Sequence, residues 1–261
     1  MDYSGDITGY IDVAQVVLYI FWAFFAGLIY YLHREDKREG YPLESDRSER
    51  SGGRVVVQGF PAIPEPKTYL LTHGGTQVSP RNERDLREIK AKPVAPWLGA
   101  PLEPTGDPMA DAVGPAAYAE RMDTPDLTLE GHNRVVPLRV ATDHSVASED
   151  ANPVGMTVVG GDGNTAGTVT DVWVDRSEAV ARYLEVAVND GGRHVLLPLN
   201  FARVNGAART ITVNSIYARH FAGVPGTREA DAVTRREEDR ICAYYGGGTL
   251  YADPARAEPW L

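Results

Sequence analysis

The longest apolar stretch of the chain covers residues 13–32 (VAQVVLYIFWAFFAGLIYYL) and contains no charged side chain. At about 1.5 Å per residue, a helix of this length spans the roughly 30 Å hydrocarbon core of a bilayer. Backbone groups in lipid must be satisfied within the segment, which favours a helix. The stretch therefore predicts a transmembrane helix, with Tyr30 and Tyr31 suited to the membrane–water interface. The alternative, a buried core helix, is typical of apolar runs of about 10 to 14 residues.

The two sides of this segment differ in charge. Asp2, Asp6 and Asp12 precede it without any Lys or Arg. The basic residues that follow closely are Arg34, Lys37, Arg38, Arg47 and Arg50. Because basic residues are enriched on the cytoplasmic side, we expect a periplasmic N-terminus and a large cytoplasmic C-terminal part. A cleaved signal peptide is not indicated, since its basic leading region and short apolar core are both missing.

Prolines are frequent in the next part of the chain, between residues 61 and 66 and again between residues 93 and 115. Proline fixes φ and lacks an N–H donor, so no helix or central strand is expected to run through these regions. Residues 69–72 could form one short strand. The many apolar side chains favour an extended arm held against a partner surface over a disordered tail.

From about Val135 onward, short apolar runs alternate with dipeptides that favour tight turns. Asp-Gly at 162–163 and 190–191 and Asn-Gly at 205–206 accept the positive φ of hairpin turns. Strands are predicted for AGTVTDVWV, RYLEVAV, VLLPL and RTITV. In RYLEVAV, Leu184, Val186 and Val188 alternate with Tyr183, Glu185 and Ala187, which indicates a single core face. Such evenly spaced strands predict a small, mostly antiparallel barrel or sandwich.

Two segments have the spacing of a helix capping box. Asp175 and Glu178 could cap a short helical turn between two strands. Thr234 and Glu237 repeat the signal near the end of the chain. They predict a C-terminal helix that stops at Gly246, because glycine is favoured where helices end.

Composition and motifs exclude several functions. The net charge of −10 argues against nucleic acid, whose phosphates need a basic face. The lone Cys242 excludes an internal disulfide and a Cys-rich metal site, and it is expected to be a small buried side chain. The six histidines lack metal-site spacing, and the glycine-rich run at 160–167 fits neither a dinucleotide nor a phosphate loop. No catalytic Ser or Cys signature is present, so we expect no catalytic residues, no metal and no enzyme.

Four phrases of the chain are long enough to be specific. They are FWAFFAGLIYYL with the REGYPLE that follows it, PTGDPMADAVGPAAYAER at 104–121, DLTLEGHN at 126–133 and EEDRICAYYGGGTLYA at 237–252. They resemble the H subunit of the purple-bacterial photosynthetic reaction centre. Residues 152–188 also resemble a PRC-barrel, the β module of that subunit. The implied fold is a single N-terminal transmembrane helix plus a mostly β, PRC-barrel-like cytoplasmic domain with a short C-terminal helix.

The expected organisation has four parts. They are a periplasmic N-terminus (1–12), the transmembrane helix (13–32), a juxtamembrane segment with a proline-rich arm (33–130) and a cytoplasmic β-barrel-like domain with a C-terminal helix (131–261). The resemblance implies a chain of the bacterial inner (intracytoplasmic) membrane that caps the L and M subunits. A cytochrome on the opposite face, the core light-harvesting antenna and membrane lipids are further expected partners. Bacteriochlorophyll, bacteriopheophytin, quinones and iron are expected in the partner subunits, and none in this chain.

The resemblance also implies a route for the two protons that the buried secondary quinone takes up on reduction to quinol. Glu178, Asp175, Arg182 and Arg134 match positions near the quinone pocket. Asp126, Glu130 and His132 match the surface where protons enter, although some relatives have a second His in place of Glu130 and an Asp in place of Thr128. Tyr41 matches a position close to the membrane surface and the partner subunits, with a structural or a protonic role. Tyr41, Tyr30 and Tyr31 are the residues expected at the partner and membrane interface.

The same residues allow other interpretations of the charged sites and of the whole chain. For the charged residues, the ordinary alternative is a solvated loop or a capped turn. For the chain as a whole, one alternative is a generic membrane-tethered PRC-barrel adaptor without an electron-transfer role. A membrane-bound hydrolase would need a catalytic constellation that the sequence does not contain.

Overall fold

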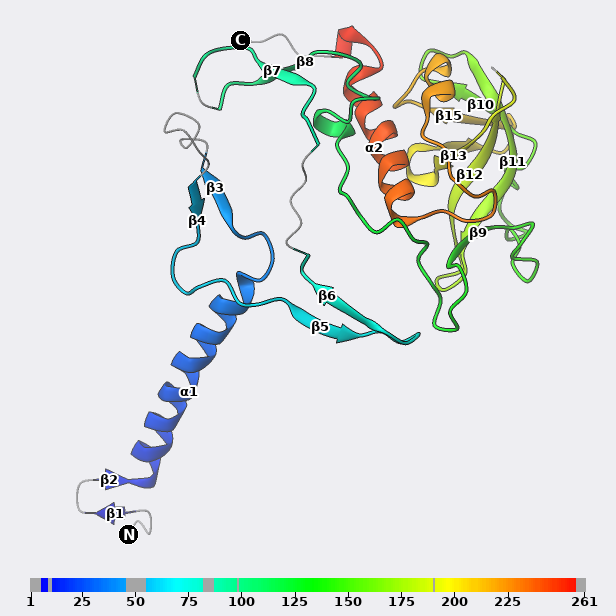
Figure 1. Cartoon of the computed structure of the whole chain (residues 1–261). Helices are drawn as coiled ribbons and strands as arrows, with labels where there is room; N and C mark the ends of the chain where they lie inside the picture. Colours follow the sequence, from blue (N-terminus) through cyan, green and yellow to red (C-terminus); the bar gives the residue numbers. More distant parts are fainter. Residues whose placement is uncertain are drawn as a thin grey trace. The chain divides into compact units, whose positions relative to one another are not determined.

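A computed structural model describes residues 6–8, 11–45, 55–81, 87–97, 99–189 and 191–256 of the chain. The chain forms two compact units: residues 1–84 with 97–99, and residues 85–96 with 100–261 (Figure 1). Asp2, Arg47, Arg50 and Asp190, which contributed to the charge asymmetry and to one predicted turn, lie outside the described residues.

The first unit contains the predicted N-terminal helix, α1, at Val13–Asp36, preceded by the short strands β1 (Asp6–Thr8) and β2 (Ile11–Asp12). Asp12 caps α1 by accepting a hydrogen bond of 2.7 Å from the backbone N–H of Gln15. None of its residues is buried, and by length and composition it is the one helix in the described part of the chain able to cross a membrane. It continues one polar turn past the expected end at Leu32, with His33 and Arg34 favourably placed near its C-terminal dipole.

The proline-rich arm contains short two-stranded ladders rather than irregular chain alone. β3 (Leu43–Ser45) pairs with β4 (Val55–Val57), β5 (Lys67–Leu70) with β6 (Thr76–Ser79), and, in the second unit, β7 (Ala91–Pro93) with β8 (Leu102–Pro104). Each of these strands has a single partner and at most four residues. Pro93 and Pro104 sit at strand ends, where a missing N–H donor is tolerated. The strand expected at 69–72 therefore exists, shifted to Lys67–Leu70.

The body of the second unit is the expected mostly β domain. Its sheet has the order β13-β12-β11-β10-β15-β14, with β9 pairing to β11. The strands are β9 (Val135–Pro137), β10 (Thr157–Gly160), β11 (Thr165–Asp175), β12 (Val180–Val188), β13 (His194–Pro198), β14 (Arg203–Asn205) and β15 (Thr210–Val213). All pairs are antiparallel except β10 with β15. Short 3₁₀ turns lie at Gly114–Ala116, Leu199–Phe201, Ala218–Gly223 and Pro254–Arg256.

Strand β12 departs from the alternation that the sequence indicates. Four consecutive residues, Tyr183 to Val186, are buried, so the strand has two covered faces instead of one. The Tyr183 hydroxyl donates to Glu238 of the C-terminal helix at 2.8 Å. The Glu185 carboxylate pairs with Arg139 at 2.7 Å. Other parts of the fold therefore bury the second face of β12, so its burial does not follow the two-residue alternation of a strand with one exposed face.

The C-terminal helix, α2, extends over Arg235–Tyr251 and lies beside the sheet (Figure 1). Its predicted capping box is confirmed, because Thr234 Oγ1 accepts from the Glu237 N–H at 3.1 Å and Glu237 Oε2 accepts from the Thr234 N–H at 2.8 Å. The predicted stop at Gly246 is wrong. A Cβ atom on Gly248 would lie 2.6 Å from the carbonyl oxygen of Ser215, so this glycine permits close packing and does not end the helix.

Candidate functional site

One arginine binds three carboxylates at the place where β9 pairs with the end of β11. Arg134 Nε donates to Asp175 Oδ1 at 2.9 Å, while its Nη2 lies 2.8 Å from Asp175 Oδ2. The same guanidinium also pairs with Glu178 Oε1 and, at 3.4 Å, with Asp126 Oδ2. Asp175 is therefore held bidentately, the geometry in which Arg binds a carboxylate most strongly. We call Arg134, Asp126, Asp175 and Glu178 the Arg134 cluster.

Two pairings bring the members of the Arg134 cluster together. A tight loop returns the chain from Asp126 to Arg134, whose N–H donates to the Asp126 carbonyl at 2.8 Å. β9 then pairs antiparallel with the end of β11, opposing Val135 to Asp175. The charged residues that are separated by about 40 positions in the sequence therefore form one site.

The predicted capping turn is formed only in part. Asp175 Oδ1 accepts from the backbone N–H groups of Ser177 at 3.0 Å and of Glu178 at 3.2 Å, as a capping side chain does. Asp175 ends β11 and Val180 begins β12, which leaves too few residues for a helix. The Glu178 carboxylate therefore binds Arg134 instead of reaching back to the backbone.

The two carboxylates on either side of Arg134 differ in environment. Asp175 is 1% exposed, whereas the Glu178 side chain is 55% exposed. Burial alone would raise the pKa of Asp175, but Arg134 and the two backbone N–H donors outweigh it and lower that pKa. Asp175 in turn raises the pKa of Arg134. The cluster thus combines a fixed, buried ion pair with a carboxylate that reaches water.

Glu130 and His132 lie near the Arg134 cluster. They line a hollow of about 460 Å³ together with His144 and Arg176. Arg176 continues from Asp175, and its N–H donates to the Arg134 carbonyl at 2.9 Å. The residues expected where protons enter are therefore adjacent to those expected near the quinone.

Arg182 lies elsewhere on β12. Among the interactions of the described residues, it does not pair with the Arg134 cluster, and it lines a separate hollow of about 510 Å³ with Tyr183 and the half-buried Cys242. Burial raises the pKa of Glu238 beside this hollow, while the Arg182 charge opposes that shift. The position of Arg182 near the quinone pocket, which the family resemblance implies, stays a prediction.

The three tyrosines expected at an interface all belong to the first unit. Tyr30 and Tyr31 are exposed on α1, and the Tyr30 ring lies 6.1 Å from that of Phe60. The ammonium of Lys37 lies 5.4 Å from the Tyr41 ring centroid, within the range of a cation–π contact. These side chains flank the end of α1.

Two family models match the chain. The model of the photosynthetic reaction centre H-chain, N-terminal region, matches residues 5–140, and the PRC-barrel domain model matches residues 146–220. The first match alone spans more than half of the 261 residues. The chain belongs to the reaction centre H-chain family. It is therefore a subunit of a photosynthetic reaction centre that associates with other subunits, and α1 fits a single-pass membrane protein.

The H-chain region and the PRC-barrel meet at the Arg134 cluster. Arg134 and Asp126 belong to the first matched region, and Asp175 and Glu178 to the second. Among the described residues, no group of three or more His, Cys, Asp or Glu side chains is arranged to hold a metal ion.

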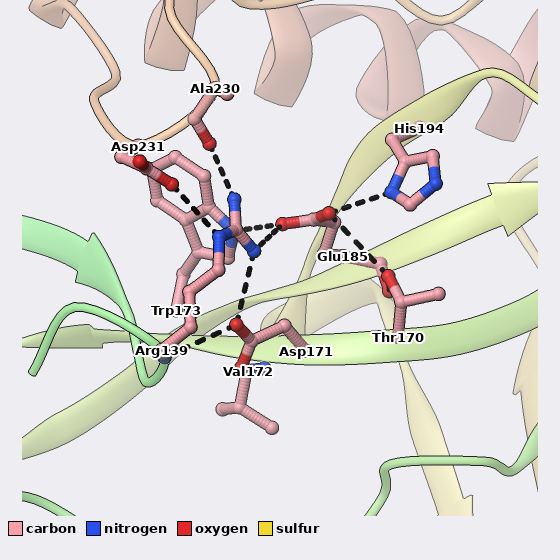
Figure 2. Close-up of polar contacts among 9 residues, drawn as sticks. All are labelled: Arg139, Thr170, Asp171, Val172, Trp173, Glu185, His194, Ala230 and Asp231. Carbon is pink, nitrogen blue, oxygen red and sulfur yellow. Dashed lines mark hydrogen bonds and ion pairs between the residues drawn. The ribbon is translucent and has the colours of Figure 1, made fainter. Parts of the chain in front are cut away.

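A second network, which sequence reasoning missed, joins the same two regions. Glu185 is 7% exposed and accepts from Arg139 Nη1 at 2.7 Å and from Trp173 Nε1 at 2.9 Å. His194 Nδ1 lies 2.7 Å from the other oxygen of this carboxylate (Figure 2). We call Glu185 and its three partners, Arg139, Trp173 and His194, the Glu185 network.

Arg139 extends this network to the segment before α2. Its guanidinium also binds Asp171 at 3.0 Å, Asp231 at 2.8 Å and the carbonyl of Ala230 at 2.6 Å (Figure 2). Burial would raise the pKa of Glu185, but hydrogen bonds from Arg139, Trp173 and His194 lower it overall. The sequence signal for this site is a glutamate among the apolar residues that end strand β12.

Proposed function

We propose that this subunit caps the L and M subunits on the cytoplasmic side and helps conduct protons to the secondary quinone. The observation that carries the proposal is the Arg134 cluster, in which the exposed carboxylate of Glu178 shares a guanidinium with buried Asp175. A quinone in a pocket closed to water needs ionisable side chains and water to deliver its two protons. Glu178 is suited to exchange a proton with solvent while Arg134 holds its side chain in one place.

The route proposed here begins at the hollow next to the Arg134 cluster. Glu130 and His132 offer a carboxylate and an imidazole in this hollow, and Asp126 offers a carboxylate that contacts Arg134 directly. We assign proton uptake to these three residues and delivery to Glu178 and Asp175. Arg134 acts as a positioning residue, and Arg182 contributes by its charge from β12.

Orientation and partners complete the proposal. The acidic residues before α1 and the basic residues after it favour a periplasmic N-terminus and a cytoplasmic barrel in the bacterial inner (intracytoplasmic) membrane. Bacteriochlorophyll, bacteriopheophytin, quinones and iron are assigned to the partner subunits. The cytochrome is assigned to the opposite face and the antenna to the surrounding membrane.

The test is Glu178→Gln in the intact complex. The amide keeps the size of the side chain but cannot exchange a proton or carry a charge. We expect the proton-coupled second electron transfer to slow on the order of 10-fold, below the roughly 10²–10⁴-fold range of general acid–base catalysis because water offers parallel routes. Flash spectroscopy across pH measures this rate, and charge separation and assembly should be unchanged.

Glu149→Gln is the matched control, since Glu149 is exposed on the same unit and outside the Arg134 cluster. An unchanged second-transfer rate in Glu178→Gln at every pH would leave Glu178 a purely structural role. The alternative function, a generic membrane-tethered PRC-barrel adaptor, predicts that outcome together with purification free of bacteriochlorophyll. The match to the reaction centre H-chain over residues 5–140 favours the first function.

A further inference from the structure

The arm is fastened to the last turn of α1 by buried and charged contacts within the first unit. Lys37, only 4% exposed, donates through Nζ to the carbonyl of Gln58 at 2.7 Å and to that of Pro61 at 2.8 Å. Glu35 pairs with Lys67 Nζ at 2.5 Å. These contacts fix the start of β5, at Lys67, to the end of the membrane helix.

This attachment sets the height of β5 relative to a bilayer. The apolar part of α1 ends at Leu32, so Glu35 lies about 4.5 Å beyond the hydrocarbon core at 1.5 Å per residue. The headgroup layer is roughly 5–7 Å thick on each side of the core. Lys67, paired with Glu35, is therefore held inside the headgroup layer.

The hairpin that starts there has exposed apolar side chains. β5 and β6 are joined by a turn in which the Leu71 N–H donates to the Gly75 carbonyl at 3.1 Å. Leu70 is 86% exposed, and Tyr69, Leu71 and Val78 are exposed as well. Two leucines at the tip of a hairpin are unfavourable in water at about 25 cal/mol per Å² of apolar surface.

The charge of the hairpin fits a membrane surface. Residues 66–81 contain no Asp or Glu, although the chain has 36 such residues among 261. They include Arg81 and Lys67, the latter paired with Glu35. Anionic headgroups attract such a segment and would repel one with the average charge of this chain. Four residues of strand reach about 13 Å, enough to carry Leu70 and Leu71 from Lys67 to the edge of the acyl chains.

We propose that the β5–β6 hairpin is a second membrane contact of this subunit, with Leu70 and Leu71 inserted at the boundary between headgroups and acyl chains. Interfacial segments of other proteins bury apolar side chains about 5–10 Å deep in the same layer. The inference rests on the membrane-spanning role of α1 and goes beyond the proposed function. The proposed occupant of this apolar surface is lipid, and a partner subunit is the competing occupant that the experiment below distinguishes.

Spin labelling tests the proposal in the intact complex, reconstituted into bilayers that contain anionic lipid. Cys242, the only cysteine, is first replaced by alanine, and Leu70→Cys is then labelled. We expect collisions with oxygen, which concentrates in lipid, to exceed those with a water-soluble nickel chelate several-fold. The matched control is Leu129→Cys, at an exposed leucine in the turn of the loop from Asp126 to Arg134. There we expect more collisions with the chelate than with oxygen.

Each other outcome rejects the inference. A Leu70 label that the chelate reaches as well as it reaches Leu129 places the hairpin in water, and a label that neither reagent reaches places it against a partner subunit. A label at Phe24 in α1 separates this failure from failure of the membrane anchor, because the nickel chelate should not reach Phe24 if α1 spans the bilayer. Glu35→Gln should reduce the oxygen preference at Leu70 but not at Phe24.

Discussion

The Arg134 cluster and the Glu185 network have the same arrangement of charges but differ in their exposure to water. Each places one arginine between carboxylates from distant segments and joins the H-chain region to the PRC-barrel. In the Glu185 network the central carboxylate lies inside a strand and is enclosed by an indole, an imidazole and a guanidinium. In the Arg134 cluster the outer carboxylate, Glu178, reaches water. The Glu185 network therefore encloses its central carboxylate, whereas the Arg134 cluster leaves its outer carboxylate exposed to water, as the proposed proton transfer requires.

The largest expected effect is a loss of stability on disrupting the enclosed Glu185 network. Glu185→Ala would leave the Trp173 indole N–H without its acceptor and remove one of the carboxylates that bind Arg139. Breaking a buried pair in this way costs several kcal/mol, and we expect a loss of about 3 kcal/mol because Arg139 keeps Asp171 and Asp231 as partners. Urea denaturation of the full chain in detergent, followed by tryptophan fluorescence, measures it. A loss within about 0.5 kcal/mol, typical of a surface change, would contradict the structural role.

The second prediction concerns the buried half of the Arg134 cluster. Arg134→Met keeps the length of the side chain but removes both hydrogen bonds to Asp175. We expect the free energy of unfolding to fall by about 2 kcal/mol, less than for Glu185→Ala, because two backbone N–H groups still solvate the Asp175 carboxylate. The same denaturation experiment compares the two variants. A larger loss in Arg134→Met than in Glu185→Ala would reverse the proposed division of roles.

Local spacing shows the charged residues of the Arg134 cluster only as two separate groups. That Arg134 lies near Asp175 and Glu178 was implied by the family resemblance alone. Asp126 with Arg134 and Asp175 with Glu178 are visible as two charged groups, because each lies within ten residues. Their union depends on the pairing of β9 with β11 across about 40 residues, which leaves no periodic signal. The short β9 itself, three residues ending in Pro137, is below the length that alternation can reveal.

Two further features escaped prediction because packing overrides local preference. Glu185 alternates with apolar neighbours and so was assigned to an outer face, which Arg139 and the segment before α2 in fact cover. Gly246 to Gly248 resemble a helix terminus, yet α2 continues because glycine allows its backbone to approach Ser215. The membrane helix, the strands after Val135 and the Thr234 capping box were predictable, since each has a strong local pattern.

The third prediction follows from the lowered pKa values of Asp175 and Glu185. A carboxyl group whose pKa is lower in the folded than in the unfolded state stabilises the fold above its unfolded pKa, about 4, and loses that contribution as the pH falls through the folded value. Wild-type stability should therefore be constant near neutral pH and decline below about pH 4. The deficit of Arg134→Met relative to wild type should shrink over the same acid range, because the variant has little pairing left to lose. A deficit independent of pH would show that packing, not the ion pair, is what Arg134 contributes.

The smallest expected effect on stability belongs to the residue with the largest proposed functional role. Glu178 is more than half exposed and meets Arg134 at the edge of a pair that Asp175 already holds bidentately. Exposed ion pairs contribute about 0–1 kcal/mol, so Glu178→Gln should change the free energy of unfolding by less than about 0.5 kcal/mol. Denaturation at neutral pH checks this value, with Glu149→Gln again as the control. A loss comparable to that of Arg134→Met would mean that Glu178 helps to build the site, and a slower second electron transfer in that variant would then report a distorted structure instead of a missing proton carrier.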